Sequence, residues 1–102
     1  MNESKGLKYY VYILQCSDGS YYTGYTEDVE KRVKKHNSGK AAKYTNVRRP
    51  VRLLYSEPCK DKQAAIKREQ QLKHWSHSKK EALIKGDVKL LKQLSKRRKK
   101  TQ

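Results

Sequence analysis

The chain has 102 residues and is strongly basic, with 26 Lys and Arg against 10 Asp and Glu and a formal net charge of +16. Its length fits one domain with a short tail, and we expect a monomer. So large a charge destabilises a compact chain by self-repulsion, which predicts a polyanionic partner, DNA or alternatively RNA. No segment approaches the ~20 apolar residues of a membrane span. Because residues 1–8 also lack the apolar run of a signal peptide, we expect a cytoplasmic protein without a membrane partner, in which Cys16 and Cys59 are free thiols.

Apolar periodicity and turn-forming residues predict three strands and several helices. In chain order we expect a strand over 9–15, a turn over 16–20, a strand over 21–25, a helix capped by Thr26 and ended at 38–39, a basic loop over 40–49, a strand over 51–56 closed by Pro58, and helices over 61–75, 79–85 and from 87 onward, with a frayed or disordered basic run at 96–100. The predicted fold class is α+β, a three-stranded antiparallel sheet flanked by helices. Residues 1–7 are interpreted as an N-terminal extension, 8–86 as the domain, and 87–102 as a C-terminal helix with a basic tail.

The turn between the first two strands leaves two registers open. A two-residue turn puts Tyr12 and Tyr22 on opposite faces of the sheet. A three-residue loop with a left-handed Gly19 instead pairs Leu14 with Tyr22, so that Tyr12 and Tyr22 share a face. A joint role for the two tyrosines requires the second register.

Arg32 and His36 stand one turn apart in the first predicted helix and project side by side. They border the apolar stripe of Val29 and Val33, at the rim of the buried face. Such a pair suits the binding of an anion. The alternative is an arginine whose stem covers apolar surface and a histidine that interacts with the helix dipole.

Glu69 falls within the apolar stripe of the helix over 61–75, among Ala65, Ile66 and Leu72. A carboxylate on an inward helix face requires a partner, a metal ion or a proton. The alternative is an i,i+4 ion pair with Lys73 at the surface. Glu69 is therefore a candidate metal ligand.

Together these residues resemble the GIY-YIG nuclease family over about residues 8–85. Tyr10-Val11-Tyr12 corresponds to the first family motif and Tyr22-Thr23-Gly24 to the second. Tyr10 stands where the first motif has glycine and Thr23 where the second has an apolar residue, and neither change removes a reactive group. The chain is most similar to the small stand-alone bacterial members. The resemblance implies the same three-stranded sheet flanked by helices.

The resemblance also implies a metal-dependent endonuclease that hydrolyses DNA phosphodiester bonds, in DNA repair or processing. The implied catalytic residues are Tyr12, Tyr22, Arg32, His36 and Glu69, with Gly24 as the motif glycine that leaves room for a close approach. Glu69 would bind one Mg²⁺ or Mn²⁺ ion, and Arg32 would hold a phosphate oxygen. Tyr12 would act as general base for water if its pKa falls toward neutrality. Which tyrosine takes the proton stays open, and a family asparagine has no match here.

Further basic residues are expected to follow the nucleic-acid backbone, with one ring available for stacking. These are Lys35, Lys40, Lys43, Tyr44, Arg48 and Arg49. The alternative is a solvated charged loop. A runner-up function is a nucleic-acid-binding module of the same fold that cuts poorly, or only with a protein partner that supplies specificity. A third, a small basic protein that binds RNA or a ribonucleoprotein, explains the charge but not the order of the five candidate catalytic residues.

Overall fold

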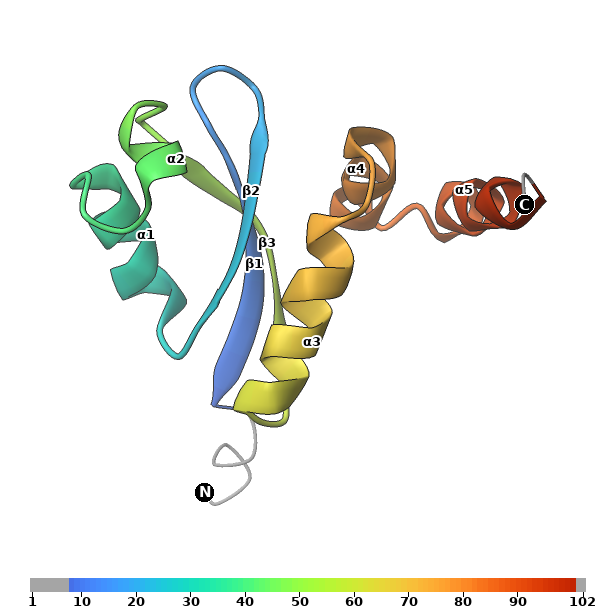
Figure 1. Cartoon of the computed structure of the whole chain (residues 1–102), viewed down its shortest axis with the longest axis horizontal. Coiled ribbons are helices and arrows are strands. Elements are labelled where there is room, and N and C mark those ends of the chain that lie inside the picture. The colour runs from blue at the N-terminus through green and yellow to red at the C-terminus, as the bar shows by residue number, and fades with distance from the viewer. Residues whose placement is uncertain (1–7, 101–102) are drawn as a thin grey trace.

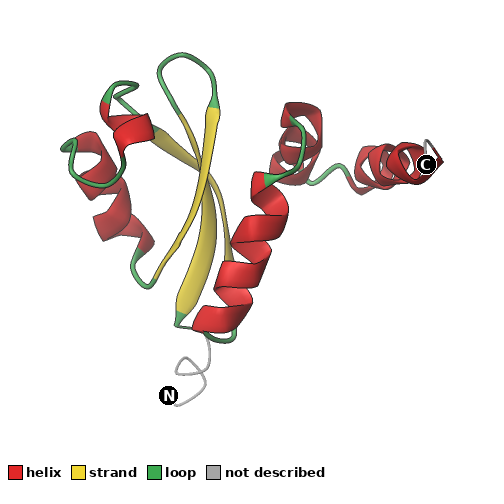
Figure 2. Ribbon diagram, in the orientation of Figure 1, coloured by secondary structure: helices red, strands yellow, loops and turns green. Residues whose placement is uncertain are grey.

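The computed structural model describes residues 8–100, and the side chains of residues 8–95. β1 (Tyr9–Gln15), β2 (Tyr21–Thr26) and β3 (Arg52–Cys59) form an antiparallel sheet in the order β2-β1-β3. α1 (Val29–Asn37) and α2 (Lys43–Asn46) lie on one side of the sheet and α3 (Lys62–Lys73) on the other (Figure 1). α4 (His77–Lys85) follows α3, and α5 (Val88–Lys100) extends beyond it (Figure 2). The predicted α+β fold class is confirmed.

The central strand β1 separates two apolar clusters because its side chains alternate between the faces of the sheet. Val11 and Ile13 pack against the apolar face of α3. Tyr12 and Leu14 belong to the second cluster, which Val33 of α1 partly covers. Residues 11–14 are each at most 1% exposed. Both faces of the sheet are therefore covered, and Tyr12 points to the α1 side.

The loop between β1 and β2 has the three-residue form. Leu14 pairs with Tyr22 and Tyr12 with Gly24. The Cys16 amide donates to the Ser20 carbonyl at 2.8 Å, and Gly19 has φ +87°, in the left-handed region that favours glycine. Tyr12 and Tyr22 therefore share a face of the sheet.

Several predicted boundaries were wrong, each for a local reason. Asp28 rather than Thr26 caps α1, since its Oδ1 atom accepts from the Lys31 amide at 3.0 Å and Thr26 ends β2. β3 continues through Pro58 to Cys59, which is tolerated because β3 is an edge strand that needs no donor on its open side. Residues 43–46 of the expected basic loop form α2.

The C-terminal part also differs from the prediction. α4 begins at His77, two residues earlier than expected, with Ser76 as its cap, and the His77 ring stacks on Tyr21 with centroids 4.0 Å apart. Gly86, at φ +71°, ends α4, and Asp87 caps α5 by accepting from the Leu90 amide. The backbone over 96–100 continues α5 rather than fraying. In the described part of the chain, every helix is too short or too polar to cross a membrane.

Candidate active site

Four of the five predicted catalytic side chains meet between α1 and the face of the sheet that α1 covers. The Tyr12 hydroxyl lies 2.9 Å from Nε2 of His36, and the ring of Tyr22 meets the His36 ring edge-on with centroids 5.0 Å apart. Arg32, on the same side of α1, lies close enough to Tyr12 for its positive charge to offset part of the rise in the pKa of the phenol. The tyrosines come from the two strands and the basic side chains from α1. The fold thus joins Tyr12 and His36, which are 24 residues apart in the chain.

Gly24 allows Tyr12 to join these side chains. The two residues are directly paired across β1 and β2, and the Tyr12 ring lies over the Gly24 backbone. A Cβ atom at Gly24 would lie 2.5 Å from the phenol oxygen and 2.7 Å from Cζ of Tyr12. Any side chain there would displace the phenol. The motif glycine therefore makes room for a residue of the protein itself.

The hydrogen-bond chain around His36 defines its tautomer. The Thr45 hydroxyl donates to the Ala42 carbonyl at 3.2 Å, so its oxygen is left to accept a proton from Nδ1 of His36, 2.7 Å away. Nε2 then carries the lone pair and accepts from the Tyr12 hydroxyl. His36 and Thr45 are both buried, at 1% and 0% exposure. The geometry thus assigns the Nδ1–H tautomer to His36.

Burial sets the protonation states of this pair. Desolvation, then the neighbouring Tyr22, raises the pKa of Tyr12 to about 12, although Arg32 acts in the opposite direction. Desolvation, then the charges of Arg32 and Lys35, lowers the pKa of His36 to about 4. Both side chains are neutral at pH 7. The pKa of Tyr12 is shifted in the direction opposite to the one that a phenol acting alone as general base requires.

Glu69 lies across the β2 edge on α3. Its side chain is on the buried face with Ala65 and Leu72, and the residue is 8% exposed. It is near enough to Tyr12 to contribute to the raised pKa of that phenol. The ion pair weighed as an alternative also exists, because Nζ of Lys73 lies 3.3 Å from Oε2 of Glu69. Because Lys73 is mostly exposed and Glu69 is mostly buried, this ion pair places the Lys73 ammonium group on the solvent side of the carboxylate.

The donor set around Glu69 suits only one kind of metal ion. Within the described residues there is no group of three or more His, Cys, Asp and Glu side chains that could hold a metal ion. Zinc sites need three or four such ligands. Mg²⁺ and Mn²⁺ are commonly held by one or two carboxylates, with water and substrate phosphate completing the shell. A single inward carboxylate such as Glu69 fits that pattern.

In the basic loop, the arginine side chains are bound to other parts of the described chain and the lysine side chains are not. Nε of Arg48 donates to Oδ2 of Asp18 at 3.1 Å, and its guanidinium lies 3.9 Å from the centroid of the Tyr44 ring. Arg49 donates to backbone carbonyls on both sides of the loop. The side-chain ammonium groups of Lys40 and Lys43 form no hydrogen bond or ion pair with the residues that the structure describes, although the Lys40 backbone amide donates to the Lys35 carbonyl. The two arginines therefore hold the loop in place, and the lysines remain available.

Tyr44 and Thr45 connect α2 to the site. Tyr44 is 38% exposed, and its ring stacks on Tyr22 with centroids 6.1 Å apart. Its predicted place next to a nucleic acid stays a prediction. The sequence carried no signal for Thr45, a polar residue inside a basic loop, because the contact with His36 depends on how α2 packs against α1.

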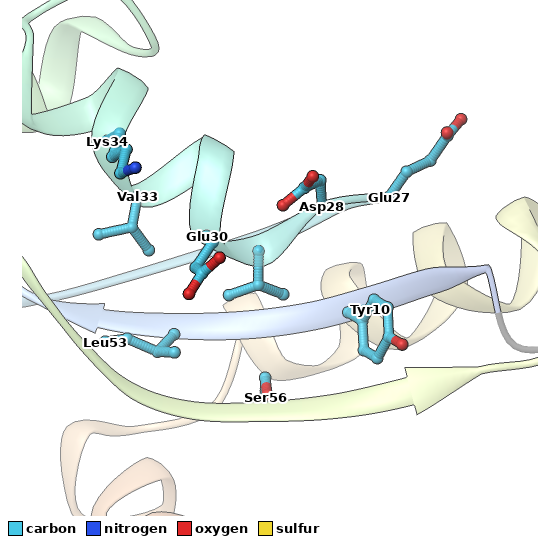
Figure 3. A pocket seen from close by; sticks show the side chains of 9 residues that line it. Tyr10, Glu27, Asp28, Glu30, Val33, Lys34, Leu53 and Ser56 are labelled. Carbon is cyan, nitrogen blue, oxygen red and sulfur yellow. The ribbon is translucent and has the colours of Figure 1, made fainter.

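A separate hollow of about 690 Å³ lies between α1 and the face of the sheet that α1 covers (Figure 3). Tyr10 and Leu53 lie on its sheet side, and the carboxylates of Glu27, Asp28 and Glu30 lie at the start of α1. None of the five predicted catalytic residues lines it. Its negative charge disfavours a phosphate backbone, which makes it the wrong site for a nucleic acid.

Comparison with known proteins identifies the family of this chain. The GIY-YIG catalytic domain family model matches residues 8–82. A UPF0213 protein of Staphylococcus saprophyticus is 54% identical over 77 residues, which cover 76% of this chain and 94% of that protein. The solution structure of a UPF0213 protein of Bacillus halodurans is 53% identical and covers 76% of this chain and 82% of its own, with a TM-score of 0.49. That of an E. faecalis protein is 38% identical and covers 78% and 85%, with a TM-score of 0.54. This chain belongs to the GIY-YIG catalytic domain family, a family of nuclease type.

Proposed function

We propose that this protein is a metal-dependent endonuclease that hydrolyses DNA phosphodiester bonds and acts as a monomer in DNA repair or processing in the cytoplasm. The observation that carries the proposal is the buried hydrogen bond between Tyr12 and His36, 2.9 Å long, beside Arg32 and across from Glu69. An isolated binding surface has no need of a buried, tautomer-defined proton acceptor. A site that removes a proton from water does need one.

The hydrolysis divides among these groups as follows. Arg32 binds a non-bridging phosphate oxygen and stabilises the charge that grows there in the transition state. Water gives its proton to the Tyr12 oxygen as Tyr12 passes its own proton to Nε2 of His36. The water oxygen forms the new bond to phosphorus while the bond to the leaving oxygen breaks, and that oxygen takes a proton from solvent. Mg²⁺ or Mn²⁺ on Glu69 would neutralise the phosphate and the leaving oxygen.

The relay is compatible with the protonation states of the pair. Neutral His36 is ready to accept a proton, although its low pKa makes the imidazolium costly in the free protein. A bound phosphate brings negative charge next to Arg32 and so favours the imidazolium. Tyr12 need not ionise on its own, because its proton leaves as the new one arrives. The tyrosine that takes the proton from water is therefore Tyr12 in this proposal, and Tyr22 positions the His36 ring.

A second candidate function is a nucleic-acid-binding module that cuts only when a protein partner completes the site. The observation that favours it is the sparse acidic set, in which Glu69 is paired with Lys73 at 3.3 Å. The uncommitted Lys40 and Lys43 serve either function equally.

The test is cleavage of labelled single-stranded, duplex and branched DNA with Mg²⁺, Mn²⁺ or EDTA. We expect metal-dependent cleavage that Glu69→Gln and Arg32→Ala abolish, while Glu69→Gln still binds DNA in EDTA. Lys73→Gln is the matched control, because it removes the partner of Glu69 but not the carboxylate. Binding without cleavage on every substrate and with every metal would reject the nuclease in favour of the module.

A further inference from the structure

A second hollow continues from the candidate active site along the open edge of β2. Its volume is about 480 Å³, and it lies at the Thr26 end of the strand. Its walls include Lys31, Arg32 and Lys35 of α1, Lys62 at the start of α3, and the rings of Tyr9 and Tyr25. Arg32 belongs both to this hollow and to the cluster around Tyr12. A strand whose phosphate is bound at Arg32 would therefore extend into it.

The hollow carries an excess of positive charge, with four basic side chains against the two carboxylates of Glu27 and Asp28. Its four basic side chains form no ion pair with any carboxylate in the described part of the chain. Glu27 and Asp28 offset part of this charge at the rim, where Glu27 accepts from the Tyr9 hydroxyl at 2.9 Å and Asp28 accepts from the Lys31 amide at 3.0 Å. An anionic ligand is thus attracted to the α1 and α3 walls.

The tyrosines give the hollow a firm aromatic wall. Tyr9 and Tyr25 pack against the apolar cluster that includes Val11 and Ala65, on the α3 side of the sheet. The hydrogen bond to Glu27 further restrains the Tyr9 ring. Aromatic rings held in this way are suitable stacking partners for a nucleobase. The volume lies in the range of sites for single small molecules, which suits a nucleotide and not a duplex.

We propose that this hollow binds one unpaired nucleotide next to the phosphate that is cut, with its base against Tyr25 and its outer phosphate on Lys31, Lys35 and Lys62. The substrate class is then a DNA strand that is unpaired beside the cut, as in a single strand, a flap or a branch, rather than a continuous duplex. A paired base cannot enter, because its faces and its pairing edge are occupied inside the helix. The direction of the strand rests on the proposed function, since Arg32 must hold the phosphate that is cut.

Binding is measured first without cleavage, in EDTA. Thymidine 3′,5′-bisphosphate is titrated into the isotope-labelled full-length protein, and the chemical shifts of the protein are followed by NMR. Binding of a fluorescent oligothymidylate of eight nucleotides is followed by anisotropy. The variants are Lys62→Gln and Tyr25→Leu, the second of which keeps an apolar side chain for folding. The control is Lys67→Gln, because Lys67 is exposed on α3 but lines a different hollow.

We expect the bisphosphate to shift the signals of Tyr25, Lys31 and Lys62, and oligonucleotide binding to weaken roughly threefold in Lys62→Gln and at least about fivefold in Tyr25→Leu, with Lys67→Gln less affected than either. Equal effects of Lys62→Gln and Lys67→Gln, without shifts at Tyr25, would overturn the subsite. If Tyr25→Leu does not fold, Lys62→Gln and the NMR shifts of the wild-type protein still test the subsite, because neither measurement uses the Tyr25 variant.

Cleavage supplies a second, separate result. If the protein cuts, the wild type should cleave a strand with an abasic site beside the scissile phosphate at least about fivefold more slowly than the intact strand. The Tyr25→Leu variant should cleave the abasic and intact strands at the same rate. Equal cutting of the abasic and intact strands by the wild type would overturn the subsite while the nuclease stands. Nucleotide binding in the hollow without metal-dependent cutting would keep the subsite and reject the nuclease.

Discussion

The Thr45 hydroxyl lies 2.7 Å from Nδ1 of His36, and both side chains are buried. Because Thr45 itself donates to the Ala42 carbonyl, it accepts from His36 and directs the lone pair of Nε2 toward Tyr12. A residue outside the Tyr12–His36 pair thereby determines which nitrogen of the histidine can accept a proton. Three elements, β1, α1 and α2, must pack correctly before the pair can function.

Replacement of Thr45 by Val should remove this control without changing the size of the side chain. We expect a mixture of His36 tautomers and a fall in kcat of about tenfold or more with little change in KM. Thr45→Ser, which keeps the hydroxyl, should restore both. ¹⁵N chemical shifts of the His36 ring report the tautomer directly, and a pure Nδ1–H tautomer in Thr45→Val would contradict the positioning role.

Substitution of Gly24 by Ala should displace the Tyr12 phenol, because the added Cβ atom would lie 2.5 Å from its oxygen. We expect a loss of about 1–3 kcal/mol in the free energy of unfolding, measured by urea denaturation. In a Tyr12→Ala background the same glycine substitution should cost much less, since the three nearest atoms all belong to Tyr12. Equal costs in the two backgrounds would show that the backbone and not the phenol requires glycine.

His36 should make the stability depend on pH. Its pKa is about 4 in the folded protein and 6.5 as a model value, so the unfolded chain binds the proton more readily between these values. The stabilisation is complete above about pH 6.5 and is lost as the pH falls toward 4, by up to about 3 kcal/mol. Urea unfolding of the wild type and His36→Asn from pH 4 to 7 measures it. An NMR titration of His36 that gives a pKa near 6.5 would rule it out.

Lysines and arginines of the basic loop should behave differently. The double variant Lys40→Gln, Lys43→Gln should weaken DNA binding and reduce the slope of log affinity against log salt by about 2. Arg48→Gln should instead cost about 1 kcal/mol of stability, because its guanidinium bridges Asp18 and the Tyr44 ring. Fluorescence anisotropy over a salt series and thermal unfolding distinguish the two. A salt-independent affinity of the wild type would reject the electrostatic interpretation.

The cleavage rate should also report the protonation state of His36. Since the pKa of His36 is about 4 in the free protein, metal-saturated kcat/KM should not fall with a midpoint near 6.5 as the pH is lowered. We expect its acidic midpoint below about pH 5. A midpoint at 6.5 would mean that His36 is not the proton acceptor, and the profile of Tyr12→Phe would then identify whether another group takes the proton.

Local sequence was sufficient for those features that depend on short-range spacing. The alternating residues of β1 and the helical spacing of Arg32 and His36 predicted the sheet and one edge of the site, because strand and helix periods determine which side chains share a face. The inward position of Glu69 followed from the apolar stripe of α3 in the same way. The turn left two registers open, and the structure selects the one with a left-handed Gly19.

Only the tertiary structure decided how these faces meet. The crossing of Tyr12 over Gly24, the contact of Thr45 with His36 and the two hollows beside α1 all join elements that are distant in the chain. The pKa directions of Tyr12 and His36 were undecided for the same reason, since they depend chiefly on burial, which arises when α1, α2 and the sheet pack together. Residue spacing carries the chemistry of the site, and packing decides its protonation.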